Sequence, residues 1–267
     1  MRKGKLLAKG RTAEIYTWKK GKVLKQFLPG WPAGDAEYEF NKASIAQQTG
    51  LAVPKVYELI EEEGRPSIIY ELIEGQTLLQ WFQRHRWAFP RLARQMAELH
   101  LDMHQRQVSG LPSQSTRLKK KIEEAAGLDA KQKEKLVAYI DELPEADKLL
   151  HGDFHPDNIM VTPNGTVIID WVDASSGHPL ADVARTVLLT TMSAIPDDLP
   201  ARRFFIVLRE IMNRMYLRHY FKHSPYKREE LKAWMLPVVA GRLSENIIEE
   251  QDYLVEYIRK RISLIDE

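Results

Sequence analysis

The sequence predicts an α+β protein with two parts: a small N-terminal lobe of antiparallel strands with one helix, and a larger, mostly helical C-terminal lobe. Residues 5–73 contain short apolar runs separated by Gly, Pro and charged turns, around a single helical pattern. From residue 77 onward the apolar residues recur mainly at helical spacing, with one strand pair near 159–171. We therefore place an N-terminal lobe at residues 1–73 and a C-terminal lobe at residues 74–267.

Two hairpins and one helix make up the predicted N-terminal lobe. Turn residues at 19–22 and at 61–65 each separate two apolar runs, which is the pattern of a hairpin. Between the hairpins, apolar residues recur at helical spacing from Asp35 to Thr49. Gly50 follows, and glycine is common just beyond the C-terminus of a helix.

The predicted C-terminal lobe consists of helices interrupted by one hairpin. Asn164-Gly165 stands between two apolar runs and predicts the turn of that hairpin. Long helical patterns then continue to the C-terminus. The helices expected before the hairpin span residues 77–88, 91–107, 116–126 and 130–142.

Composition excludes several classes of protein. Lys plus Arg number 39 and Asp plus Glu 37, so the net charge of +2 does not favour a nucleic-acid partner. The chain has no cysteine, which excludes disulfides, thiolate zinc sites and cysteine nucleophiles. The N-terminal apolar run stops at Lys9-Gly10, too soon for a signal peptide, and no run approaches the roughly 20 apolar residues of a membrane span. We expect a cytoplasmic protein without a membrane partner; its oligomeric state is open.

The densest polar cluster is His-Gly-Asp-Phe-His-Pro-Asp-Asn at residues 151–158, followed by a hairpin that ends in Ile-Ile-Asp-Trp at 168–171. The returning strand of the hairpin brings Asp170 back beside the loop that carries Asp153 and Asn158. Two carboxylates and an amide then converge. Phosphoryl transfer needs such a set, because a carboxylate orients the attacking hydroxyl and oxygen ligands hold magnesium.

These motifs resemble the aminoglycoside phosphotransferase and choline kinase family, relatives of the protein kinases. The resemblance continues through Asp-Trp-Val-Asp-Ala at 170–174 and Gly-His-Pro-Leu-Ala-Asp-Val-Ala-Arg-Thr at 177–186. It implies a protein-kinase-like fold of two lobes that hold the nucleotide between them. It also implies a magnesium-dependent kinase that moves the terminal phosphoryl group of ATP or GTP to a hydroxyl of a small-molecule acceptor.

The resemblance assigns roles to individual residues. Asp153 would be the catalytic base or substrate-orienting aspartate, and Asn158 and Asp170 would hold Mg2+. Lys25 would contact the α- and β-phosphates of the nucleotide. Its partner on the following helix would be Glu39, with Glu37 as the alternative because the helix register is open by a residue or two.

The resemblance also places the nucleotide-binding segments. Residues 10–14 would be the loop over the phosphates, although they contain one glycine where protein kinases have several. The carbonyl of Glu71 and the amide of Ile73 would bind adenine, with Tyr70 just before them. Trp171-Val172 replaces the Phe-Gly pair of protein kinases, which favours a small-molecule kinase.

Two other functions remain possible from the sequence. The sparse glycine loop is compatible with a nucleotide-binding regulator that lacks catalysis. Alternation of His151, Asp153, His155 and Asp157 would place all four on one face of an extended segment, as in a metal-dependent hydrolase.

Several polar residues are better explained by structure than by chemistry. His100 and His104 have metal-ligand spacing, but their apolar neighbours favour a packed helix. We interpret Asp182 as a helix cap or other structural support, and Arg185 likewise as a support. The acidic segment 244–252 would favour a cationic acceptor if it lined the acceptor site, but a solvated helix face is the simpler interpretation.

Overall fold

The chain forms two compact units, and each is described here by itself. The first comprises Met1–Arg84 and Pro156–Ala174, and the second comprises His85–His155 and Ser175–Glu267. This computed structural model describes residues 3–10, 12–194 and 202–265, so Arg11 of the predicted phosphate loop lies outside the described residues. The lobe boundary at residues 73 and 74 was drawn from the change from strand-like to helical sequence patterns, and it stays a prediction.

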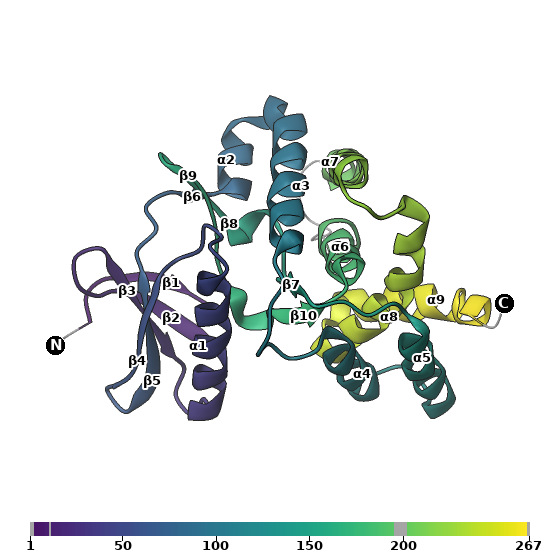
Figure 1. Cartoon of the computed structure of the whole chain (residues 1–267), viewed down its shortest axis with the longest axis horizontal. Coiled ribbons are helices and arrows are strands. Elements are labelled where there is room, and N and C mark those ends of the chain that lie inside the picture. Colours follow the sequence, from purple (N-terminus) through teal and green to yellow (C-terminus); the bar gives the residue numbers. More distant parts are fainter. Residues whose placement is uncertain (1–2, 11, 195–201, 266–267) are drawn as a thin grey trace. The chain divides into compact units, whose positions relative to one another are not determined.

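The first unit is built on a five-stranded antiparallel sheet with the order β1-β2-β3-β5-β4. Helix α1 packs against this sheet (Figure 1), and Ala13, Phe27, Ala36 and Ile68 form a core between them. The elements are β1 (Leu6–Lys9), β2 (Ala13–Thr17), β3 (Lys22–Phe27), α1 (Ala33–Gln48), β4 (Val56–Glu62) and β5 (Arg65–Glu71). The edge strand β1 is exposed along its length and was not predicted.

Local sequence explains the boundaries of these elements. Gly50, with φ of 77°, follows α1 as predicted, because glycine adopts the left-handed conformation without steric cost. Glu63 and Gly64 both have positive φ, 52° and 72°, in the turn between β4 and β5. Two successive positive φ values are the mark of the tight turn that matches the twist of paired strands.

A second, three-stranded sheet belongs to the first unit although its strands are distant in sequence. Ile168 N donates to Ala52 O at 2.9 Å, and Lys42 Nζ donates to Val172 O at 2.6 Å. These bonds tie the late hairpin to the N-terminal segment. The elements are β6 (Gln76–Thr77), α2 (Leu78–Arg84), η2 (Pro156–Asn158), β8 (Ile159–Thr162), β9 (Gly165–Ile168) and η3 (Trp171–Asp173).

The predicted hairpin forms, but its turn lies one residue earlier than expected. Thr162 pairs with Gly165, so Pro163 and Asn164 are the two turn residues. The prediction of an Asn164-Gly165 turn was therefore wrong by one position, because Gly165 is needed where β9 begins with φ of 126°.

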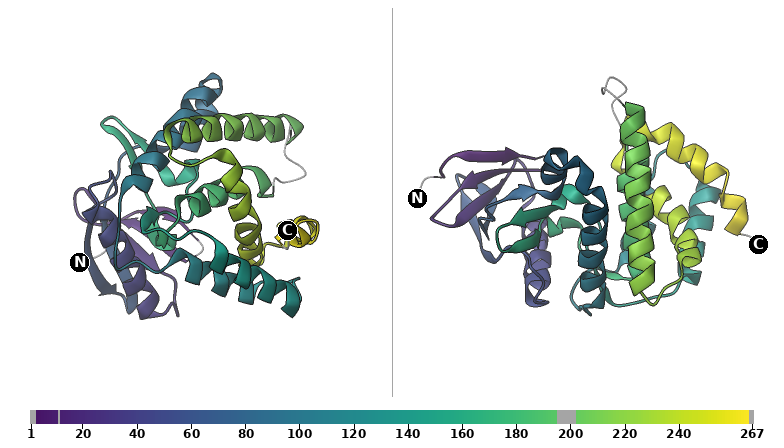
Figure 2. Two further views of the ribbon diagram at one scale, coloured as in Figure 1. Left: turned by 45° about the vertical axis from the view of Figure 1, so that its right-hand side comes forward. Right: turned by 90° about the horizontal axis from the view of Figure 1, so that it is seen from above.

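The second unit is mostly helical. Helix α3 runs beside α7, and α6 lies against α8 (Figures 1 and 2). Its first elements are η1 (Arg86–Ala88), α3 (Phe89–Gln105), α4 (Gln114–Glu124), α5 (Ala130–Glu142), β7 (Lys148–Leu150), β10 (Ser175–Gly177) and α6 (Pro179–Val187). It ends with the π-helical turn η4 (Leu188–Met192), then α7 (Arg202–His223), η5 (Arg228–Glu230), α8 (Leu231–Arg242), η6 (Leu243–Glu245), α9 (Ile248–Arg259) and η7 (Ile262–Ile265).

Capping residues set the starts of these helices. Ser113 accepts from Thr116 N at the start of α4, and Asp129 forms a capping box with Gln132 at the start of α5. All four helices predicted before the hairpin are present, with ends shifted by a few residues. Within residues 3–10, 12–194 and 202–265, no helix has both the length and the apolar character that crossing a membrane requires.

Candidate active site

Three predicted site residues meet in the first unit. Lys25 lies in β3, and its Nζ is 2.6 Å from Glu39 Oε1 and 3.6 Å from Asp170 Oδ1. Strand β3 supplies the lysine, α1 the glutamate and the end of the late hairpin the aspartate. One ammonium is therefore shared by two carboxylates that lie 131 positions apart in the sequence.

Helix register explains why Glu39 rather than Glu37 pairs with Lys25. Glu39 shares the inward face of α1 with Ala36, Ala43 and Ala46, all buried, whereas Glu37 is exposed. Positions separated by three, four and seven residues lie on one face of a helix.

Glu39 is buried and Lys25 is partly buried, and their opposite charges lie in contact. Burial disfavours the charged ammonium, yet Glu39 and Asp170 together raise the pKa of Lys25 above its ordinary value. Tyr70 Oη donates to the same Glu39 Oε1 at 3.2 Å, a contact that sequence analysis missed. Glu39 is only 3% exposed, and its Oε2 has no hydrogen-bond partner among the described residues. A buried carboxylate oxygen without a partner is costly, and a catalytic role or a bound water or ion can account for it.

Asp170 has an unusual backbone. Its φ of 64° and ψ of 68° lie in the left-handed region, and its side chain is 43% exposed. This conformation costs a non-glycine residue roughly 1–2 kcal/mol, although Asp tolerates it better than most. Strain of this kind persists where the surrounding structure demands it, typically at functional sites.

Asn158 lies beside this aspartate across the hairpin. Ile169 N donates to Asn158 O at 2.9 Å, so the strands bring Asn158 opposite the residue that precedes Asp170. Asn158 is buried. Carboxylate and amide oxygens next to a lysine form the hard donor set that Mg2+ with nucleotide phosphates prefers, so these residues fit a magnesium-nucleotide complex.

The remaining predicted nucleotide segments lie in the same unit. Glu71 is the last residue of β5, opposite Lys22, and Ile73 lies between β5 and β6. Gly10 N donates to Ala13 O at 2.8 Å, so this amide closes the β1–β2 turn. The roles predicted for these segments in nucleotide binding stay predictions.

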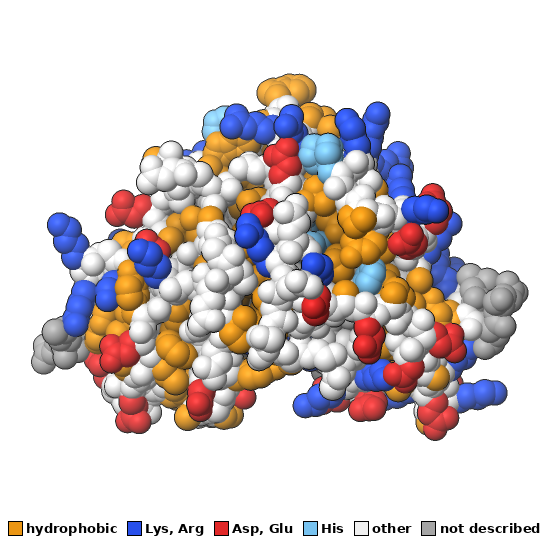
Figure 3. Space-filling model, in the orientation of Figure 1, with side chains coloured by type: hydrophobic (Ala, Val, Ile, Leu, Met, Phe, Trp, Pro, Cys, Tyr) orange, Lys and Arg blue, Asp and Glu red, His pale blue; other side chains and the backbone are white. Residues whose placement is uncertain are grey.

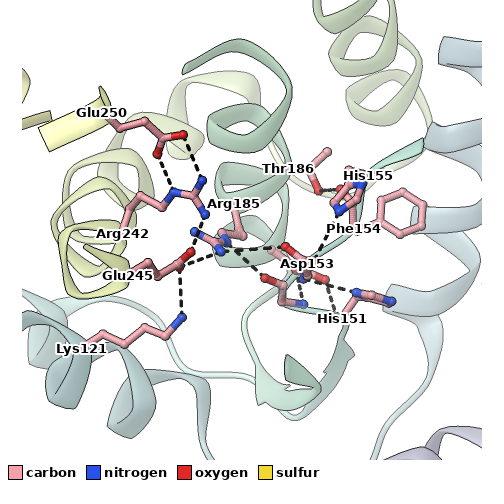
Figure 4. Close-up of polar contacts among 12 residues, drawn as sticks. Lys121, His151, Asp153, Phe154, His155, Arg185, Thr186, Arg242, Glu245 and Glu250 are labelled. Carbon is pink, nitrogen blue, oxygen red and sulfur yellow. Dashed lines mark hydrogen bonds and ion pairs between the residues drawn. The ribbon is translucent and has the colours of Figure 1, made fainter. Parts of the chain in front are cut away.

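Asp153 belongs to the second unit, on the loop after β7. His155 Nε2 lies 3.3 Å from Asp153 Oδ2, and Arg185 Nη2 lies 3.8 Å from Asp153 Oδ1 (Figure 4). Burial alone would raise the pKa of Asp153, but His155 and Arg185 lower it to about 2. Asp153 is therefore a carboxylate at neutral pH.

Helix α6 holds the loop of Asp153 in place. Asp182 accepts from His151 N at 2.7 Å and from Gly152 N at 2.8 Å, and Arg185 Nε donates to Gly152 O at 3.2 Å. Sequence analysis interpreted Asp182 and Arg185 as structural supports, and these contacts agree with that interpretation. The helix-capping alternative for Asp182 is wrong, because His178 Nδ1 accepts from Leu180 N and caps α6. The sequence carried no local pattern for the actual role.

Two histidines complete the support of Asp182. His100 Nε2 and His104 Nε2 lie 3.1 and 3.5 Å from Asp182 Oδ2, and their Nδ1 atoms lie 2.6 and 2.8 Å from the hydroxyls of Tyr216 and Tyr220. A carboxylate only accepts, so each Nε2 carries the proton and each Nδ1 accepts from a tyrosine. These three potential metal ligands are buried and already hydrogen-bonded, which suits a packed support.

The geometry does not support the hydrolase hypothesis. Four ligands on one face would require an extended backbone from 151 to 157. Instead the chain turns at Gly152, with φ of 78°, and enters η2 at Pro156. His151 is fully buried, and its Nδ1 accepts from Asp153 N at 3.2 Å.

An antiparallel sheet unit with a paired lysine, and a helical unit with a supported aspartate loop, define a kinase-like phosphotransferase. The model of the phosphotransferase enzyme family matches residues 4–234. The chain belongs to this family and is a small-molecule kinase, which confirms the resemblance and the fold class predicted from the sequence.

Solved structures share the fold at low identity. A thermostable mutant of aminoglycoside phosphotransferase APH(4)-Ia with AMP-PNP and hygromycin B has a TM-score of 0.63 and 19% identity, covering 98% of this chain and 92% of that one. An amicoumacin kinase with AMP-PNP and Ca2+ has a TM-score of 0.61 and 17% identity over 97% and 87%. An aminoglycoside 2'-phosphotransferase with GDP has a TM-score of 0.57 and 17% identity over 98% and 90%. No curated protein sequence matches the chain.

Proposed function

We propose that this kinase transfers the terminal phosphoryl group of ATP or GTP, with Mg2+, to a hydroxyl of a small-molecule acceptor, and that Lys25, Asn158, Asp170 and Asp153 do this work. The sharing of the Lys25 ammonium between Glu39 and Asp170, at 2.6 and 3.6 Å, carries the proposal. It supplies a fixed cation beside a metal-ligating carboxylate, as binding of a metal-nucleotide complex requires.

Lys25 binds the α- and β-phosphates of the donor. Because Glu39 fixes the ammonium and itself is buried, the lysine needs little reorganisation when the phosphates arrive. Asn158 and Asp170 would hold Mg2+, which when bound offsets negative charge on the phosphates. The adenine or guanine base binds along Glu71 and Ile73.

Asp153 orients the acceptor hydroxyl. A carboxylate whose pKa is about 2 is a weak base toward an alcohol. It therefore accepts a hydrogen bond and aligns the oxygen for in-line attack, taking the proton late, which suits the loose transition state of phosphoryl transfer.

The acidic segment does not identify a cationic acceptor. Glu245 pairs with Arg185, Arg242 and Lys121, and Glu250 pairs with Arg242. Acidic and basic side chains are also interspersed over the molecular face drawn in Figure 3. We therefore propose a hydroxyl acceptor without a requirement for multiple positive charges.

Binding and turnover measured together test the proposal. The thermal midpoint of the purified protein is measured with MgATP, MgGTP, each nucleotide alone and Mg2+ alone, since a ligand at a hundredfold excess over its Kd adds about 2.7 kcal/mol. Turnover is then assayed with the better nucleotide against kanamycin, hygromycin B, choline, homoserine and a hexose. We expect a shift that needs both metal and nucleotide, and phosphorylation of one acceptor class.

Three variants assign the residues. Asp153→Asn should lower kcat by about 100- to 10,000-fold while leaving the MgATP-dependent shift intact. Asp170→Asn and Asn158→Ala should weaken the shift itself. A shift without turnover by the wild type on any acceptor or water would favour a nucleotide-binding regulator, and a tightly bound transition metal on elemental analysis would favour a hydrolase.

A further inference from the structure

Arg185 contacts three groups around the loop of Asp153. Its Nε donates to Gly152 O at 3.2 Å, and its Nη2 lies 2.7 Å from Glu245 Oε1 but 3.8 Å from Asp153 Oδ1 (Figure 4). A distance of 2.7 Å is that of a charge-assisted hydrogen bond, whereas 3.8 Å is too long for any hydrogen bond. The nitrogen is thus bound to Glu245 and only near Asp153.

Other cations fix Glu245. Arg242 forms an ion pair with Glu245 Oε2, and Lys121 Nζ lies 3.3 Å from Oε1. Arg242 in turn donates from Nε and Nη2 to both oxygens of Glu250, at 2.8 and 3.1 Å, and Ala194 N also donates to Glu250. Arg242 and Glu250 are buried, so this bidentate pair is a firm anchor at the junction of α8 and α9.

A chain of alternating charges therefore runs from the C-terminal helices to the loop of Asp153. Figure 4 shows the sequence Glu250, Arg242, Glu245, Arg185, Asp153. Each member lies in the second unit. The last contact, between Arg185 and Asp153, is the longest in the chain of charges, and it involves the predicted acceptor-orienting group.

We propose that Glu245 is a positioning residue for phosphoryl transfer: it holds the Arg185 guanidinium on the Gly152 carbonyl and prevents it from closing onto the Asp153 carboxylate. The role rests on the proposed function of Asp153. Glu245 acts through Arg185 and touches neither nucleotide nor acceptor.

Electrostatic attraction explains why Arg185 has to be held away from Asp153. A guanidinium beside a carboxylate closes to a hydrogen-bonded pair, often bidentate, unless something else holds it. Such a pair would occupy the Asp153 oxygen that accepts the hydroxyl of the acceptor. Arg185 at the longer distance still favours the ionised carboxylate by its charge and still supports the loop through Gly152.

A double-mutant cycle tests the proposal. The proteins are the wild type, Glu245→Gln, Arg185→Gln and the double variant, with Glu256→Gln as a control that removes the same charge from an exposed α9 position paired with Lys260. Each is assayed for kcat and for KM of the acceptor found in the panel above. Where no acceptor is found, hydrolysis of MgATP or MgGTP by water serves instead.

The expected result is non-additive. Glu245→Gln lowers kcat by about tenfold with KM unchanged within about twofold, since releasing Arg185 costs roughly one hydrogen bond to a charged group. In the Arg185→Gln background the same substitution has no further effect, because the group to be restrained is gone. Glu256→Gln leaves both constants unchanged.

Two kinetic outcomes overturn the proposal. An equal loss of kcat in both backgrounds means that Glu245 acts without Arg185. A raised KM for the acceptor with kcat unchanged means that Glu245 binds the acceptor directly.

A crystal structure of Glu245→Gln beside the wild type tests the restraint without any assay. We expect Arg185 Nη2 to close from 3.8 Å onto Asp153; an unchanged distance overturns the proposal even if kcat falls. A wild type that binds MgATP or MgGTP but turns over neither would instead remove the proposed function, and the role of Glu245 in catalysis with it.

Discussion

The Lys25 cluster of the first unit and the Asp153 loop of the second differ in how fully their polar groups are paired. In the cluster, Glu39 Oε2 is buried without a partner among the described residues, and Asp170 is strained and half exposed. Around the loop, both oxygens of the buried Asp182 accept hydrogen bonds from backbone amides. We expect groups that bind a ligand to keep unused hydrogen-bonding capacity, and groups that only position another residue to have theirs fully used. The first region should therefore lose affinity when altered, and the second should lose stability.

The largest stability effect is expected at Asp182. Asp182→Ala leaves the amides of His151 and Gly152 and two histidines without their acceptor, which should lower the free energy of unfolding by about 3–5 kcal/mol. Urea unfolding measures it. The control is Asp102→Ala, which removes a partly exposed ion pair between Asp102, near the end of α3, and Arg106, the residue that follows the helix. This loss should cost under about 1 kcal/mol. Equal losses in the two variants would mean that the saturated network adds no stability.

The next effect is expected at Lys25. Lys25→Met should weaken MgATP binding by about 10- to 100-fold, since a hydrogen bond to a charged group contributes roughly 1.5–3 kcal/mol. Titration calorimetry measures it. Lys22→Met on the same strand is the matched control, because Lys22 lies over the ring of Tyr57 and has no predicted contact with phosphate. If both variants bound nucleotide like the wild type, the cluster would be only structural.

A smaller effect on stability is expected at Asp170, where two variants distinguish the cost of the strained backbone from the role of the carboxylate. Asp170→Ala and Asp170→Gly both remove the carboxylate and should abolish metal-dependent nucleotide binding. The left-handed backbone is unfavourable for alanine, which has a Cβ atom, but not for glycine. The glycine variant should therefore be more stable to urea by about 1–2 kcal/mol. Identical stabilities would indicate that the backbone relaxes once the aspartate is gone.

The last effect, spread over several pH units, is a pH dependence of stability from the saturated region. Burial, together with the neighbouring His100, lowers the pKa of His104 from 6.5 to about 4. Between these values the unfolded chain binds a proton that the folded chain does not, so stability falls as the pH drops, by up to about 1.4 kcal/mol per pH unit. Burial likewise lowers the pKa of His100.

Urea unfolding at several pH values from 7 to 5 measures this slope. His104→Gln should be less stable at pH 7 but should show a flatter dependence on pH. As the pH falls below about 4, stability should fall further, because the unfolded chain then protonates Asp182 more readily than the folded chain does. His100 and His104 outweigh burial and hold the pKa of Asp182 well below its usual value. If His104→Gln left the slope unchanged, His104 would not be the source of the pH dependence.

The sequence by itself determined the broad layout of the elements and the motifs of the site. Local periodicity placed α1 and the four helices of residues 77–142, and the run from His151 to Trp171 predicted the loop and hairpin that carry Asp153, Asn158 and Asp170. Such features depend on neighbours a few residues apart, which a sequence displays directly. Sequence analysis did not predict the edge strand β1, the short strands β6, β7 and β10, or the register of the hairpin turn, because their patterns are short.

Only the tertiary structure decided how these residues are held. The pairing of Lys25 with Glu39 depends on which face of α1 packs against the sheet, and the hold of Asp182 and Arg185 on the loop spans about 30 positions of sequence. Glu245 reaches Arg185 from farther still. Long-range contacts arise from the packing of whole elements, whose orientations no local pattern specifies. The sequence therefore named the chemical groups, and packing decided which of them remain open to a ligand and which are saturated.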